Sequence, residues 1–131
     1  MRLSRLPFGA QSALALSVLT LCLASGCGTS APAAVDINPQ LVGVWIIEGG
    51  ATYTITAAGD TYELSVVDSD GEVFEVTSLT WDGSVLAWTY FVPSSGANVR
   101  EETTHIGENR IDVGWVNSEG DIGTDILNRV Q

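Results

Sequence analysis

The residues that could carry out catalysis are few, and they lie close together in one short run. His105 is the only histidine of the chain, and it ends the run Glu101-Glu102-Thr103-Thr104-His105. In an extended strand, Glu101, Thr103 and His105 would share one face. One interpretation places Glu101 and His105 inside the fold as polar contacts for a ligand. The alternative, which we favour, is an exposed strip of charge on a strand. Since nucleophilic catalysis needs a base beside a nucleophile, and no such pair is assembled in the sequence, we expect no catalytic residues and no enzyme activity.

One acidic segment has the composition of a calcium-binding loop. Asp68-Ser69-Asp70-Gly71-Glu72 offers several oxygen ligands within five residues. It lacks the longer spacing of an EF-hand, and Asp-x-Asp-Gly is also a favourable hairpin turn. We interpret the segment as a turn. No zinc spacing, phosphate-binding loop or dinucleotide motif is visible, so we expect no metal and no cofactor.

Aromatic residues are the better candidates for a binding function. Large rings form either the wall of a ligand cavity or an ordinary core, and for any single ring the core is the commoner outcome. Trp88 and Tyr90 share one face of a predicted strand, and Trp115 has the matching face of another. The candidate ligand-binding residues are Tyr53, Trp88, Tyr90, Trp115 and His105.

The elements that must position these side chains are strands. From residue 40 onward the hydrophobic pattern repeats every two residues, and seven turns rich in Gly, Asn and Asp divide the chain. A phase change near Thr77 and Ser78 indicates a β-bulge. The predicted strands are Val42–Ile47, Ala51–Ala57, Thr61–Val67, Val73–Trp81, Ser84–Val92, Ala97–Ile106, Arg110–Val116 and Asp121–Val130.

Short connections between consecutive strands predict an all-β, antiparallel up-and-down meander. Eight strands in a row would leave two unprotected edges, and closure into a small barrel removes both. The sequence therefore predicts an eight-stranded barrel, and the alternative is a flattened two-sheet β-sandwich.

The N-terminal region has the features of an export signal. Arg2 and Arg5 precede an apolar stretch that ends in Leu23-Ala24-Ser25-Gly26-Cys27. This sequence resembles the bacterial lipobox, which implies a signal peptide over 1–26 and palmitate-type acyl chains on Cys27. A lipidated Cys27 would hold the protein on the cell membrane or the outer membrane, facing the periplasm or the exterior. Residues 27–38 are then a flexible tether, and 39–131 form the barrel domain.

The charge of the chain is strongly negative. Sixteen acidic residues face five arginines, and the formal net charge is −11. Removal of Arg2 and Arg5 with the signal peptide would make the remaining chain more acidic still. Such a charge argues against nucleic acid as a partner and is typical of a soluble surface.

The start of the barrel domain resembles a known group of proteins. Gly43-Val44-Trp45 places a Gly-x-Trp at the beginning of the first strand. This pattern is similar to that of the calycins, which include lipocalins, fatty-acid-binding proteins and avidins. The resemblance implies that Trp45 closes the base of a barrel and that Arg129, from the last strand, stacks across it as a structural plug. Ile47 stands where avidins place a polar contact, so biotin binding is not expected.

These patterns together lead to one functional expectation. We expect a membrane-anchored envelope lipoprotein whose lipocalin-like barrel is a non-catalytic binding module for a small hydrophobic ligand. The alternative is a structural or protein-interaction lipoprotein whose barrel is packed solid.

Overall fold

A computed structural model describes residue 28 and residues 34–131 of the chain. The chain divides into two units, Met1–Ala31 and Pro32–Gln131. The second unit contains every described strand and the whole hydrophobic core, so it is a folding unit in its own right. Cys27 and the predicted signal peptide lie outside the described residues. Among those described, the structure has no helix with the length and hydropathy of a membrane span.

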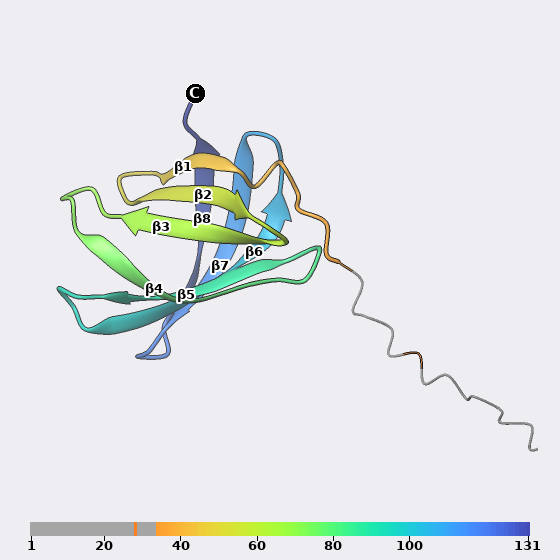
Figure 1. Cartoon of the computed structure of the whole chain (residues 1–131). Coiled ribbons are helices and arrows are strands. Elements are labelled where there is room, and N and C mark those ends of the chain that lie inside the picture. Colours follow the sequence, from red (N-terminus) through yellow and green to blue (C-terminus); the bar gives the residue numbers. More distant parts are fainter. Residues whose placement is uncertain (1–27, 29–33) are drawn as a thin grey trace, which may run out of the picture. The chain divides into compact units, whose positions relative to one another are not determined.

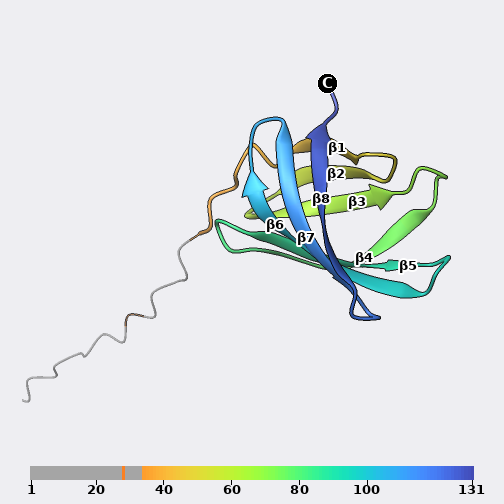
Figure 2. The same ribbon diagram turned by 180° about the vertical axis from the view of Figure 1, so that it is seen from behind.

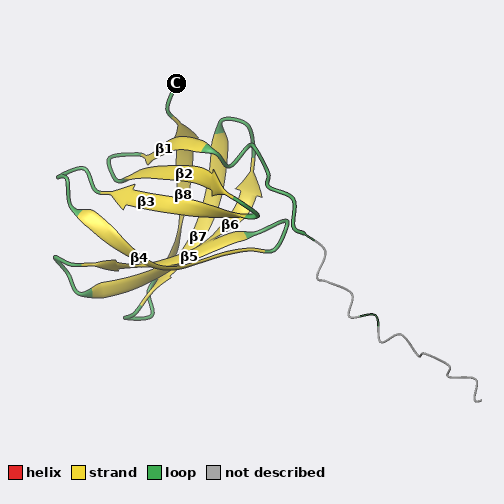
Figure 3. Cartoon of the chain, viewed as in Figure 1, coloured by secondary structure: helices red, strands yellow, loops and turns green. Residues whose placement is uncertain are grey.

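Eight antiparallel strands form a closed barrel in which each strand pairs with the next and β8 returns to β1 (Figures 1 and 2). This confirms the predicted meander and its closure, and it excludes the flattened sandwich. Figure 3 shows only strands and loops in the described part of the chain. The strands are β1 (Gly43–Ile47), β2 (Thr52–Ala58), β3 (Thr61–Val67), β4 (Val73–Trp81), β5 (Leu86–Val92), β6 (Ala97–Ile106), β7 (Arg110–Asn117) and β8 (Ile122–Arg129).

The ladder between β4 and β5 contains the predicted bulge. Its register shifts between Val76 and Ser78, where the alternation of the sequence changes phase. The extra residue keeps Phe74 and Val76 inside before the bulge and Leu79 and Trp81 inside after it. β3 and β4 pair only at Val66–Phe74 and Val67–Val73, and a hollow separates the strands beyond these pairs.

The interior is filled by side chains from all around the barrel. Alternate residues of each strand point inward, as the pleat requires. The largest completely buried side chains include Trp45, Trp88 and Tyr53, and the rest of the core is aliphatic and aromatic. Tyr53 packs edge-on against Trp88, with ring centroids 6.1 Å apart. Aromatic packing of this kind fills a small barrel without a large central void.

One end of the barrel, which we call the plugged end, is closed by Arg129 and by residues 37–42, which precede β1. The Arg129 guanidinium carbon lies 4.1 Å from the centre of the Trp45 ring. Its nitrogens donate to the carbonyl oxygens of Gln40, Val42 and Glu108 at 2.6, 2.9 and 2.6 Å.

Sterics explain why the residue two positions before Trp45 is a glycine. Gly43 has a φ of +150°, and a Cβ there would collide with Nη1 of Arg129. The Gly-x-Trp spacing thus leaves room for the guanidinium beside the indole. The indole of Trp45 also donates to the carbonyl oxygen of Leu41 at 2.9 Å, which fixes its orientation.

The last strand presents its apolar residues to the outside. Leu127 is buried and pairs with Ile111 and Ile47, so Asp125 and Arg129 share its inward direction. Ile122, Ile126 and Val130 therefore point outward, with 79, 41 and 48% of their surfaces exposed. The outer apolar face, as we call this surface, comprises Val44, Ile46, Val116, Ile122, Ile126 and Val130.

Candidate ligand site

A buried carboxyl group lies at the centre of the barrel, surrounded by aromatic residues. Glu101 on β6 has only 2% of its surface exposed. The hydroxyl groups of Tyr53 on β2 and Tyr90 on β5 both donate to its Oε1, at 3.0 and 2.8 Å. Three strands far apart in sequence thus contribute to one polar cluster, which we call the Glu101 cluster.

The Glu101 cluster leaves two polar atoms without a partner. Within the described residues, neither Glu101 Oε2 nor Trp88 Nε1 has a hydrogen-bond partner, although both are buried. A buried polar atom without a partner costs about 1–3 kcal/mol relative to a satisfied one. Such an atom, next to a pocket, is a place where a proton or a donor group of a ligand would be stabilised.

The environment of Glu101 favours its neutral form. Burial raises the pKa of Glu101 to about 7, and the negative charge of Asp125 also raises it, against hydrogen bonds from Tyr90 and Tyr53 that lower it. Burial likewise raises the pKa values of Tyr53 and Tyr90, and the charge of Glu101 adds to this effect. The two tyrosines therefore remain donors, and Glu101 exchanges its proton near neutral pH.

A pocket of about 280 Å³ opens at the end of the barrel opposite the plug. We call it the mouth pocket. Its wall combines aliphatic and aromatic groups with a few polar ones, as small-molecule sites commonly do. The lining residues are Tyr90, Val92, Ser95, Ala97, Val99, Glu101, Trp115, Asn117 and Asp125.

The strand register explains why these side chains meet. Glu101 pairs with Trp88 on β5 and with Trp115 on β7, so the three side chains point to the same side of the sheet. Asp125 on β8 pairs with buried Val113, which turns its carboxyl inward as well. Glu101 is buried and Asp125 is half-buried, so the Glu101 carboxyl lies deeper in the pocket.

Four of the five predicted ligand-binding residues come together in this region. Tyr53 and Trp88 are buried beside Glu101, whereas Tyr90 and Trp115 line the mouth pocket itself. Whether they bind a ligand stays a prediction.

His105 does not belong to this group, and its predicted place on the same face as Glu101 is wrong. The β6–β7 register shifts between Thr103 and His105, so His105 pairs with Asp112 and is exposed. It borders a separate hollow near the plugged end, together with Trp81 and Thr104. The extra residue of this bulge moves His105 to the opposite face of β6 from Glu101. The alternation of residue types in the sequence does not show where such a bulge lies.

The favoured expectation that Glu101 is exposed is also wrong. A carboxyl group faces the interior only when donors from other strands meet it, and here they come from Tyr53 and Tyr90. Asp125 was missed altogether. The only sequence signal was that Arg129 had to face inward to reach Trp45, because this requires Leu127 and Asp125 to do the same.

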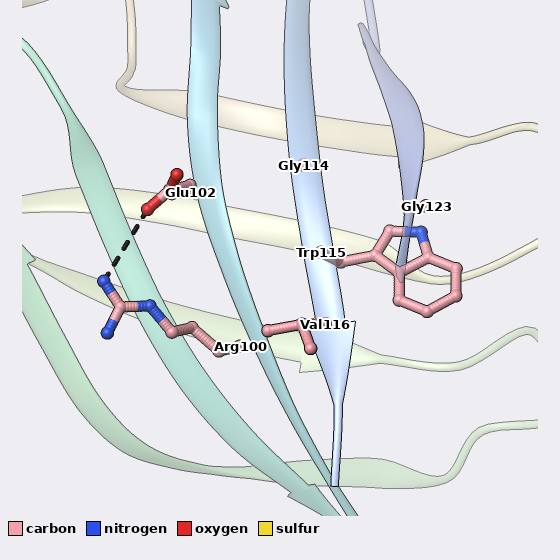
Figure 4. Close-up of a pocket in the computed structure, with 6 residues that line it drawn as sticks. All are labelled: Arg100, Glu102, Gly114, Trp115, Val116 and Gly123. Carbon is pink, nitrogen blue, oxygen red and sulfur yellow. Dashed lines mark ion pairs between the residues drawn. The ribbon is translucent and has the colours of Figure 1, made fainter. Parts of the chain in front are cut away.

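The Trp115 ring also borders a second hollow. It pairs with Gly123, and a Cβ at Gly123 would overlap the indole ring. Figure 4 shows the ring against Gly123, in this hollow of about 380 Å³, which also contains the Arg100–Glu102 ion pair, 3.6 Å long. None of the polar side chains that line this hollow is buried, in contrast to Glu101 in the mouth pocket.

The acidic turn between β3 and β4 behaves as a turn. Oxygens of Asp68, Asp70 and Glu72 lie within 4.8 Å of one another. However, Asp68 accepts from Ser69 N at 2.7 Å, Asp70 from Glu72 N at 2.9 Å, and Glu72 from Ser94 N and Oγ at 2.6 and 2.7 Å. Together with the backbone bonds Asp68 N–Glu72 O and Gly71 N–Asp68 O, at 2.8 and 3.0 Å, they hold the segment as the predicted turn.

Comparison with known proteins identified no matching family, and no curated protein or solved structure matches the chain.

Proposed function

We propose that this chain is a membrane-anchored envelope lipoprotein of the calycin type, and that its barrel is a non-catalytic binding module for one small ligand. The observation that carries the proposal is the mouth pocket: a hollow of about 280 Å³ at one end of a closed barrel, with a buried, incompletely hydrogen-bonded carboxyl group among its lining residues. Its volume is near the lower limit of about 300 Å³ for small-molecule sites, so the ligand is small.

The packing of the barrel restricts where that ligand can lie. Trp45, Trp88 and Tyr53 fill the middle, so a long acyl chain has no path through the barrel axis. The ligand would instead place an apolar body against Val99 and Trp115 in the mouth. This narrows the expected ligand from a hydrophobic molecule of any length to a short one.

Blocking the mouth pocket tests the proposal. Ala97 lines the pocket, and Asn98, the next residue, is exposed. In the unit Pro32–Gln131, Ala97→Trp should abolish binding of small apolar fluorescent probes, whereas Asn98→Trp should leave it unchanged. The readout is probe emission together with quenching of tryptophan fluorescence. If no probe binds the parent protein, or if both variants bind equally, the mouth pocket is not the site.

The anchor needs a separate test. Growth of the source cells with an alkyne-tagged palmitate should label the protein, and Cys27→Ser should remove the label and the protein from the membrane lipoprotein fraction. A labelled Cys27→Ser protein, or an unlabelled parent, would contradict the proposal.

The outer apolar face favours a second candidate function, docking to a protein partner in the envelope. Ile122 and Ile126 on β8 expose 79 and 41% of their surfaces, and exposed apolar residues gathered on one face mark many interaction sites. Ile126→Asp should then abolish cross-linking to that partner and leave probe binding in the mouth pocket intact. Unchanged cross-linking would remove this candidate.

A further inference from the structure

The mouth of the barrel carries carboxyl groups at two depths. Glu101 lies at the inner part of the pocket, and Asp125 lies nearer to solvent. Three turns around the same end add further carboxylates, and these turns contain no Lys or Arg. The acidic residues of the turns are Glu48, Asp68, Asp70, Glu72, Glu119 and Asp121. Such a field raises the local concentration of cations and repels anions.

Glu101 provides an independent sign that the pocket recognises a donor. Only 2% of the surface of Glu101 is exposed, and the residue lines the pocket. Its Oε2 accepts no hydrogen bond within the described residues. Oε1 already accepts from both tyrosines. The Trp88 indole, which is paired with Glu101 in the sheet, also lowers the pKa of the carboxyl, but its Nε1 makes no hydrogen bond, so Oε2 remains free. A single N–H donor with a positive charge would complete this arrangement.

The remainder of the wall suits an organic cation better than a metal ion. Ca²⁺ takes about six to eight oxygen ligands. The pocket offers two carboxyl groups, one of them half-occupied, and the side chains of Ser95 and Asn117. Among the described residues, Glu101 and Asp125 belong to no group of three acidic, His or Cys side chains close enough to share an ion. Tyr90 and Trp115 present aromatic rings, and aromatic rings attract ammonium groups. Val92, Ala97 and Val99 supply apolar surface for the body of the ligand.

We infer that the mouth pocket binds a small primary amine, with its ammonium group on Glu101 Oε2 and Asp125 and its apolar body against Trp115 and Val99. This inference rests on the proposed function, because it names the ligand class of the same site. The charged and titratable groups that face Glu101 are Tyr53 from β2, Tyr90 from β5 and Asp125 from β8. Both tyrosines stay neutral, so Glu101 and Asp125 set the charge of the site.

Three matched compounds test the ligand class by calorimetry on the unit Pro32–Gln131 at pH 8. They are 2-phenylethylamine, 2-phenylethanol and 3-phenylpropanoate, which share an aromatic body and carry a positive, a neutral and a negative end. The amine should bind roughly tenfold or more tightly than the alcohol, as expected for a charge-assisted hydrogen bond. The carboxylate should bind weakest of all.

Two variants and one control locate the effect. Glu101→Gln should remove the advantage of the amine over the alcohol, and Asp125→Asn should reduce it several-fold. Glu102→Gln changes the next residue, which points outward and pairs with Arg100, and it should leave the advantage unchanged. Near-ultraviolet circular dichroism verifies that each variant is folded.

The dependence on pH gives a further readout. The amine needs an ionised Glu101, whose pKa is about 7, so its binding should weaken at least tenfold from pH 8 to pH 5, while binding of the alcohol should change little. At pH 7 the amine should release protons on binding, which is detected as a dependence of the binding enthalpy on the buffer.

The outcomes separate the two levels of the proposal. Equal binding of amine and alcohol, or an amine advantage that persists in Glu101→Gln, would overturn the amine inference and leave the binding module standing. Stabilisation by CaCl₂ that competes with the amine would overturn it in favour of a metal site. If neither these compounds nor the apolar probes bind, both the inference and the proposed function fail.

Discussion

At the residue scale, the central feature is a carboxyl group that the fold buries and only half satisfies. Two tyrosine hydroxyls donate to Glu101 Oε1, and Oε2 has no partner among the described residues. Burial raises its pKa to about 7, so the folded protein binds this proton more tightly than the unfolded chain does. The stability of the protein is therefore linked to the protonation of one side chain.

This linkage has a definite sign. Since the folded-state pKa lies above the ordinary value of 4.5, the contribution of Glu101 is fully present below about pH 4.5 and is lost as the pH rises through 7. We expect Glu101→Gln to remove this loss. Relative to the parent, the variant should gain about 3 kcal/mol in free energy of unfolding between pH 4.5 and pH 8.5.

Urea unfolding at several pH values measures this gain. Glu102→Gln is the matched control, since Glu102 is exposed and should show no such difference. A gain in Glu101→Gln that does not vary with pH would show that Glu101 is not the linked group.

The plugged end gives a second prediction at this scale. Gly43→Ala places a methyl group where Arg129 Nη1 lies and forces an L-residue into a φ of +150°. We expect a loss of about 2–4 kcal/mol, because the backbone is strained and the guanidinium must leave the Trp45 ring. At Gly114, a Cβ would meet only Thr104 Cγ2 at 3.7 Å, an ordinary contact.

Thermal unfolding of both alanine variants checks the steric argument. Gly114→Ala should unfold close to the parent. If Gly43→Ala were equally stable, the motif glycine would have no packing role.

At the element scale, the ladder between β3 and β4 is short for the length of its two strands. β3 and β4 share only two residue pairs, while β6 and β7 are paired along most of their length. Backbone amides that lack a ladder partner exchange with solvent without local unfolding. The barrel is closed, but β3 and β4 leave most of their facing edges unpaired.

Amide hydrogen exchange should locate these unpaired edges. Among Thr61–Ser65 and Val76–Trp81, we expect the amides that point across the β3–β4 gap to exchange within minutes, whereas paired amides of β6 and β7 stay protected. Measurement by two-dimensional NMR separates the two groups. Uniform protection of β3 and β4 would show that the hollow between them is closed in solution.

The strands themselves were predictable, and the direction of some side chains was not. Period-two alternation and turn residues located all eight strands to within two residues at each end, and a phase change located the β4 bulge. The second bulge, near Thr104, lies in a run of polar residues where alternation carries no information, so the position of His105 was predicted incorrectly. Pairing with β7, a long-range contact, decides that register.

The candidate site was predictable only in part, for the same reason. Its aromatic members follow from large rings on matching faces of β5 and β7. Glu101 and Asp125 do not follow, because an acidic residue in a strand normally faces water. Their inward direction depends on Tyr53, Tyr90 and Arg129, which lie on other strands or at the other end of β8.

At the scale of the whole molecule, electrostatic repulsion opposes folding. The formal net charge is −11, and the described residues form only two ion pairs, both largely exposed: Arg100–Glu102 and Arg110–Asp112. Exposed pairs contribute about 0–1 kcal/mol each. Salt therefore weakens only two small favourable ion pairs, whereas it screens the repulsion among the many acidic side chains.

We accordingly expect added salt to stabilise the protein. Raising NaCl to a concentration where the Debye length is about 4 Å should raise the Tm by roughly 4 °C or more. Differential scanning calorimetry checks this. A falling Tm would mean that specific ion pairs outweigh general repulsion.

The pairing of β8 with β1 makes the order of the strands circular. Val130 N donates to the carbonyl oxygen of Val44 at 2.9 Å, so the backbone finishes beside the strand with which it starts. A gene rearranged to join these neighbours through a short linker, and cut instead in the Asp68–Gly71 turn, would still encode every strand pair of the parent. Only the two backbone hydrogen bonds that span this turn would depend on the cut. New termini would then flank the mouth pocket, and a reporter fused there would lie next to the site where a ligand enters.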